Sequence, residues 1–149
     1  MTTTAPAPAL NPQIVGQAEK AHKPVLDRIL ARTGTTMNQW VALKFTAVSG
    51  GSADRDQLGS AIAGALQIDD SAALAAVTEL TTAELLKHLP GEGASRLGFT
   101  DAGQALFRQI SSAVDEVVTR VYADIPADDL ATAGRVLTLV TTRLNAART

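Results

Sequence analysis

Cysteine and histidine, on which thiol chemistry, most zinc sites and much acid–base catalysis depend, are scarce in this chain of 149 residues. It contains no cysteine and only two histidines, His22 and His88. Disulfides, thiolate metal sites and thiol-based redox sensing are therefore excluded, and a zinc site would need carboxylates. The sequence also has no glycine-rich phosphate motif, nucleophile elbow or His-Glu metal motif. We expect no enzymatic activity, metal or cofactor, and interpret the histidines as surface or pocket residues.

Composition and charge are typical of a soluble globular protein. Hydrophobic residues make up 46% of the chain and charged residues 19%, and the formal net charge is −2 at pH 7. This length suffices for one domain with a hydrophobic core. No apolar run reaches the roughly 18 residues of a membrane span, and no secretory signal is present, so we expect a cytoplasmic protein without membrane contact. Any DNA binding must come from local basic patches, because the chain has no overall positive charge.

The N-terminal part of the sequence predicts an arm followed by a long helix. Residues 1–10 are uncharged threonine, alanine and proline apart from two apolar residues, and predict a disordered arm. Asn11 and Pro12 are typical of a helix start, and this helix should run to about residue 33. Pro24 lies inside it and predicts a kink or a restart, because proline lacks an amide and clashes with the preceding turn.

Capping residues and glycines predict two further helices. Thr36 and Gln39 have the spacing of a capping box and begin a second helix. The Ser-Gly-Gly-Ser segment at residues 49–52 should end it. Apolar residues recur at every fourth position over about residues 54–66, which predicts a third, short helix.

The middle of the chain predicts a helix-turn-helix followed by a hairpin. A turn at residues 67–70 leads to a fourth helix that begins at Ser71, with an inner face of Leu74, Val77 and Leu80. Two extended segments, residues 85–89 and 95–99, flank a glycine-rich tip and predict a β-hairpin. A hairpin in this place is a wing. The sequence therefore predicts a mainly α fold with a winged helix-turn-helix over about residues 36–99.

The last two helices predict self-association. They follow Thr100 and Pro126 and are long and rich in valine and leucine. A chain of this length cannot cover all of that apolar surface by itself, which indicates a homodimer. The alternative is that the stripes pack within a monomer. The residues that we assign to dimerisation are Val114, Val118, Val121, Leu137, Val140 and Leu144.

Three short motifs in this order resemble the MarR family of bacterial transcriptional regulators. They are Thr36-x-x-Gln39-Trp40, the stretch Phe99-Thr100-Asp101-Ala102-Gly103 after the wing, and Ile125-Pro126-Ala127-Asp128-Asp129-Leu130 before the last helix. The resemblance implies a single domain over residues 11–149, whose helices over about 11–33 and 100–147 form a homodimer. It also implies that each winged module presents a recognition helix to the DNA major groove.

The predicted recognition helix departs from the family pattern. Side chains that read base edges are usually Arg, Lys, Asn or Gln, yet the first half of this helix is Ser-Ala-Ala-Leu-Ala-Ala. Family members commonly have arginine where Ala75 and Glu79 stand, and Asp69 and Asp70 should repel phosphates. By position, the residues of this helix that would face DNA are Ser71, Ala72, Ala75 and Thr78.

The predicted wing is also poor in basic residues. Family wings usually carry an Asp-x-Arg pair, and Gly91-Glu92-Gly93 stands there instead. The cations that remain as candidate DNA contacts are Arg55, Lys87, His88 and Arg96. Each could equally be a solvated surface charge.

Two functions are compatible with the sequence. The first is a dimeric regulator of a promoter that binds double-stranded DNA, with a small aromatic effector shifting the spacing of its modules. By family position, His22, Trp40 and Lys44 would line the effector pocket, although Trp40 could instead belong to the core. The second is a winged-helix dimer that has lost DNA reading and binds a ligand or a protein.

Overall fold

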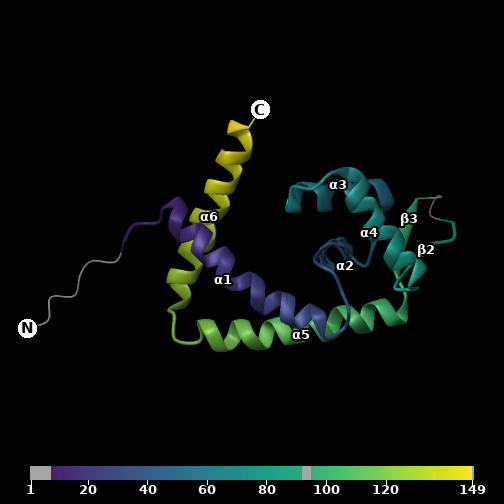
Figure 1. Cartoon of the computed structure of the whole chain (residues 1–149), viewed down its shortest axis with the longest axis horizontal. Helices are drawn as coiled ribbons and strands as arrows, with labels where there is room; N and C mark the ends of the chain where they lie inside the picture. Colours follow the sequence, from purple (N-terminus) through teal and green to yellow (C-terminus); the bar gives the residue numbers. More distant parts are fainter. Residues whose placement is uncertain (1–7, 92–94, 149) are drawn as a thin grey trace, which may run out of the picture. The chain divides into compact units, whose positions relative to one another are not determined.

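The computed structural model describes residues 8–91 and 95–148, most of which are helical (Figure 1). The chain divides into two compact units, one up to Val114 and one from Asp115. The order of elements is α1 (Pro12–Ala31), α2 (Met37–Val48), β1 (Ser52–Asp54), α3 (Arg55–Leu66), α4 (Asp70–Thr82), β2 (Leu86–His88), β3 (Arg96–Phe99), α5 (Asp101–Tyr122) and α6 (Ala127–Ala147). Residues 1–7 of the predicted arm lie outside the described part.

The helices of the first unit begin where the capping residues predict. The Asn11 side chain accepts a hydrogen bond from the Ile14 amide at 2.9 Å at the start of α1. At α2 both bonds of the capping box are formed, from the Gln39 amide to Thr36 Oγ1 and from the Thr36 amide to Gln39 Oε1, each 3.1 Å long. α4 begins one residue earlier than predicted, and Asp69 at its N-cap makes no side-chain capping bond.

α1 continues through Pro24, so the predicted alternative of a restart is wrong. Proline removes a single backbone donor and crowds the preceding turn, and α1 is exposed around Pro24. Lys23 Nζ and the Asp27 carboxylate form an ion pair 2.8 Å long and one turn apart, which contributes little because both side chains are exposed. A helical proline is therefore accommodated in an exposed segment of α1.

The sheet has three antiparallel strands in the order β1-β3-β2. β2 and β3 form the predicted hairpin, whereas β1 was not predicted. Gly50 and Gly51 precede β1 with φ of 88° and 97°, a conformation that favours glycine and that turns the chain from α2 to the sheet edge. The predicted tip residues Glu92 and Gly93 lie outside the described residues.

The core of the first unit lies between the sheet, helices α2, α3 and α4, and the first part of α5. Its largest fully buried apolar side chains are Leu43, Ile62, Leu80, Leu86, Leu97, Ile110 and Val77. Gly59 lets α3 approach α4, because a Cβ at this position would lie 2.7 Å from Leu74 Cδ2. Val77 and Leu80 are buried as predicted, while Leu74 is half-buried against Gly59. This packing fixes the buried face of α4 against the core and leaves the opposite face of the helix accessible to solvent.

The second unit, residues 115–149, contains the end of α5 and all of α6. No residue of α6, which is described over its whole length, is buried within this single chain. Of the six residues assigned to dimerisation, Val114 and Val140 are half-buried and the others are exposed. The apolar surface that motivated the dimer prediction is therefore accessible.

In the described part of the chain, no helix combines the length and hydropathy needed to span a bilayer.

Candidate nucleic-acid interface

α4 presents one accessible face, on which the predicted base-reading residues lie. Ser71, Ala75 and Thr78 are exposed, and Ala72 is half-buried. The opposite face is fixed in the core by Ala73, Ala76, Val77 and Leu80. Because these two sets alternate with the helical period, the orientation of α4 follows from its apolar residues. The accessible face offers two hydroxyl groups and alanine methyl groups to a ligand.

The charges of α4 are negative. Its sequence contains no lysine, arginine or histidine, and its acidic residues are Asp70 and Glu79. Asp69 and Asp70 are exposed at the start of the helix, where they interact favourably with the helix dipole. The same carboxylates would repel DNA phosphates. If α4 contacts bases, its own side chains therefore provide no electrostatic attraction to the DNA phosphates.

Glu79 is held by a side chain of α2. Gln39 Nε2 donates to Glu79 Oε2 at 3.2 Å, while Gln39 Oε1 accepts from the Thr36 amide in the capping box. The capping-box motif predicts the local bond at Thr36. It carries no signal for the bond to Glu79, which lies 40 residues further along the chain.

The sheet register sorts the wing cations between two faces. Leu97 and Leu86 are buried, so their face of the sheet is the core face, and His88 pairs with Leu97 on that side. Lys87 and Arg96 occupy the other positions of the alternation and share the outer face. Lys87 is exposed, whereas Arg96 is half-buried and donates through Nη2 to Ser52 Oγ at 3.0 Å. β1 thus holds the guanidinium of Arg96.

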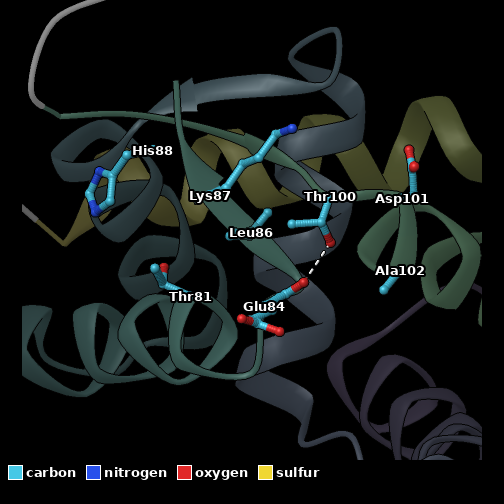
Figure 2. A pocket seen from close by; sticks show the side chains of 8 residues that line it. All are labelled: Thr81, Glu84, Leu86, Lys87, His88, Thr100, Asp101 and Ala102. Carbon is cyan, nitrogen blue, oxygen red and sulfur yellow. Dashed lines mark hydrogen bonds between the residues drawn. The ribbon is translucent and has the colours of Figure 1, made fainter. Parts of the chain in front are cut away.

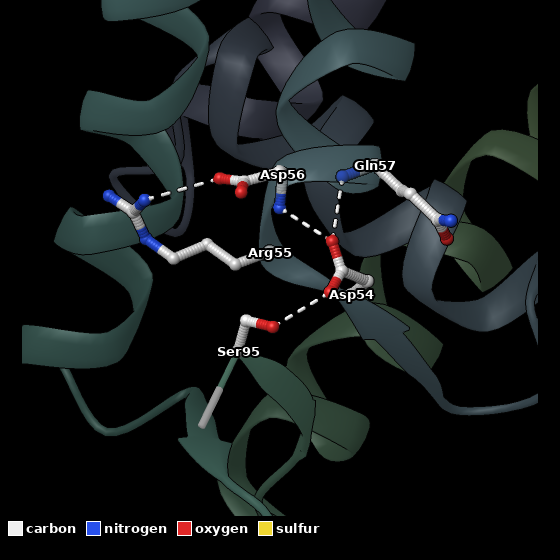
Figure 3. Close-up of polar contacts among 5 residues, drawn as sticks. All are labelled: Asp54, Arg55, Asp56, Gln57 and Ser95. Atoms are coloured by element: carbon white, nitrogen blue, oxygen red, sulfur yellow. Dashed lines mark hydrogen bonds and ion pairs between the residues drawn. The ribbon is translucent and has the colours of Figure 1, made fainter. Parts of the chain in front are cut away.

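Asp54 ties the start of α3 to the wing (Figure 3). Its Oδ1 accepts from the Asp56 and Gln57 amides at 3.0 and 3.1 Å, and its Oδ2 accepts from Ser95 Oγ at 2.8 Å. The hydrogen bond from the Gln57 amide, followed by that from Ser95, lowers the pKa of Asp54. Asp54 therefore stays ionised and fixes the base of the wing.

Arg55, the predicted phosphate contact of α3, faces its neighbour Asp56. The two side chains approach to 3.7 Å between Arg55 Nη1 and Asp56 Oδ1, and Asp56 is largely exposed. An exposed ion pair of this kind contributes little to stability. The Arg55 side chain can therefore leave Asp56 for another anion at small cost.

A cavity of about 550 Å³ lies beside β2 and the start of α5 (Figure 2). It brings together Lys87 and His88 with the acidic residues Glu84 and Asp101. Thr100, which also lines it, donates through Oγ1 to the Glu84 carbonyl at 2.6 Å. Because Lys87 and two carboxylates line the same cavity, it has no single electrostatic character.

The residues of the predicted effector pocket lie in different surroundings. Trp40 is buried, and its ring stacks on that of Phe107 with 5.6 Å between centroids. Lys44 Nζ lies 6.0 Å from the centroid of Trp40, within reach of a cation–π interaction. His22 is exposed on α1, with Nδ1 2.6 Å from the Ala18 carbonyl oxygen. None of the three residues lines the cavity beside β2 and the start of α5, and the effector pocket stays a prediction.

Comparisons with known proteins define the class of fold. No family model and no curated protein sequence matches the chain. Solved structures do match. A MarR family transcriptional regulator from Silicibacter pomeroyi has a TM-score of 0.74 at 16% identity, over 90% of this chain and 88% of that one. NadR in complex with 4-hydroxyphenylacetate has a TM-score of 0.70 at 22% identity, over 89% and 95% of the two chains.

The third structure is the S. aureus MepR–DNA complex, with a TM-score of 0.69 at 18% identity over 88% of this chain and 94% of MepR. Because the sequence identities are only 16–22%, these structural matches establish the fold alone. The chain has a winged helix-turn-helix, with α3 and α4 as its helix pair and β2 and β3 as its wing. This chain has the fold of MarR family transcriptional regulators, as the sequence motifs predicted.

Proposed function

We propose that the protein is a dimeric, DNA-binding transcriptional regulator. The observation that carries this proposal is the accessible face of α4, in a chain that shares its fold with MepR, a protein solved on DNA. In a winged helix-turn-helix, that face is the one that enters the major groove. Residues 11–149 would then act as one MarR-like domain in the cytoplasm.

The proposed DNA affinity comes from few cations. Lys87 and Arg96 share the outer face of the wing, and Arg55 lies at the start of α3. With these three cations in each protomer, a dimer would neutralise about six phosphates, which corresponds to a log–log salt slope of about −5. Backbone amides and the hydroxyls of Ser71 and Thr78 would add contacts without charge.

The proposed dimer rests on exposed apolar residues of the last two helices. Val121 and Leu144 are 58% and 61% exposed in the single chain, and α6 has no buried residue. A second copy would remove this surface from water, with a free energy gain of about 25 cal/mol per Å². A symmetric dimer would also place two α4 helices on successive major grooves.

Fluorescence anisotropy with a labelled duplex from the protein's own upstream region tests DNA binding. We expect saturable binding at low salt and a slope near −5 when the salt concentration is raised. Arg55→Ala and Lys87→Ala should each make the slope shallower by about two in the dimer, because each removes one phosphate contact per protomer. Absence of binding to any duplex at low salt would refute the proposal.

A second candidate function is a winged-helix dimer that binds a ligand or protein and does not read DNA. The observation that favours it is the charge of α4, which lacks a cation and carries Glu79 on its outer side. NadR was solved with 4-hydroxyphenylacetate, which makes small aromatic acids the first ligands to test. Quenching of Trp40, the chain's single tryptophan, would report their binding near the predicted pocket.

A further inference from the structure

We infer that Glu79 is a specificity-determining residue that accepts a hydrogen bond from the N4 amino group of cytosine in the major groove. This inference rests on the proposed DNA binding and assigns a base to the carboxylate of α4. It begins from the pairing of Glu79 with Gln39, because this pairing gives an exposed side chain a fixed place.

The orientation of the Gln39 amide follows from its partners. The Thr36 amide can only donate, so the atom of Gln39 that faces it at 3.1 Å must be the oxygen. The amide nitrogen is then left to donate to Glu79 Oε2 at 3.2 Å. The backbone of the α2 N-terminus therefore holds the carboxylate through one intermediate side chain.

The second carboxylate oxygen of Glu79 is available to a ligand. Glu79 Oε1 has no hydrogen-bond partner among residues 8–91 and 95–148. Glu79 is exposed, and it follows Ala75 by one helical turn on the outer side of α4. The short side chain of Ala75 leaves room beside the carboxylate. An approaching base edge would thus meet a pre-positioned acceptor.

The chemistry of the acceptor selects cytosine. In the major groove guanine presents two acceptors and thymine one, and both would repel a carboxylate. Adenine has an amino donor, but the N7 acceptor lies next to it. Cytosine presents its N4 amino group without a neighbouring acceptor, so a carboxylate is matched best there. One such contact should favour cytosine roughly 5- to 10-fold over the other bases.

The test is selection by the full-length protein from a library of duplexes with a randomised core, followed by anisotropy on the four versions of the selected site. We expect Glu79→Gln to change the preference at one position from cytosine to adenine, because an amide matches the paired N6 and N7 groups of adenine. Gln39→Glu keeps the capping box but replaces the donor by a second carboxylate. It should keep the preference for cytosine and reduce its strength several-fold.

Glu116→Gln, on an exposed residue of α5, is the control for loss of one negative charge. It should leave the selected motif unchanged. If wild type and Glu79→Gln bind DNA but select the same motif, or if neither selects one, the assignment of cytosine to Glu79 is refuted and DNA binding stands. If wild type binds no duplex, the proposed function fails together with this inference.

Discussion

Replacement of Gly103 by alanine should strongly destabilise the protein. A Cβ at this position would lie 1.9 Å from the carbonyl oxygen of Leu85, 2.8 Å from its carbonyl carbon and 3.2 Å from its Cα. All three atoms belong to the backbone, so no side-chain rotation relieves the clash. α5 would have to move by more than 1 Å, which would also strain the bonds from Thr100 to the Leu85 and Glu84 carbonyls. We expect a loss of about 3 kcal/mol or more, the upper end for overpacking.

Thermal unfolding followed by circular dichroism measures this loss. A destabilisation of about 3 kcal/mol corresponds to a Tm lowered by roughly 6–12 °C for a chain of this size. Gly59→Ala should cost less, because its Cβ would meet the flexible tip of Leu74 at 2.7 Å. Gly64→Ala has nothing within 4 Å and should raise stability by about 0.5–1 kcal/mol. A Gly103→Ala variant that melts at or above the wild-type temperature would contradict the reasoning.

Three further predictions concern α6, α2 and the base of the wing. Leu137→Asp should convert the proposed dimer to monomeric or unfolded chain in light scattering, and an unchanged dimer mass would place the interface elsewhere. Thr36→Ala should lower the free energy of unfolding by about 1 kcal/mol in urea titrations, with Thr36→Ser close to wild type. Because its hydrogen bonds lower the pKa of Asp54, the ionised carboxylate stabilises the fold at neutral pH, and this contribution is lost as pH falls through the folded-state pKa. The Tm advantage of wild type over Asp54→Asn should therefore vanish in acid, and an advantage that persists there would contradict this.

The features that could be predicted from the sequence depend on neighbouring residues. The capping box of Thr36 and Gln39 and the glycines after α2 fixed both ends of that helix. The period of Val77 and Leu80 predicted which face of α4 is buried, and hence which face is accessible. Each of these signals acts within one or two helical turns. For this reason the local pattern was sufficient for the helices and for the hairpin.

The features that could not be predicted depend on residues far apart in the chain. β1 has three residues, too few to show an alternating pattern, and it exists because β3 pairs with it. The contact between Arg96 and Ser52 follows from that pairing and spans 44 residues. The sequence therefore predicted Arg96 as a candidate DNA contact or a solvated surface charge, and carried no signal for its hydrogen bond to β1.

The pairing of β1 with β3 also has a consequence for folding. Ser95 and Asp54, whose side chains hydrogen-bond across this junction, are 41 residues apart, and α3 and α4 lie on the segment between them. Closing a segment of this length costs chain entropy. The bonds between β1 and β3 offset this cost only after the two strands have paired. The Ala53 amide, which faces Leu97 across the pair of β1 and β3, should therefore exchange with deuterium only when the sheet opens, in the same event as the amides in the centre of α4.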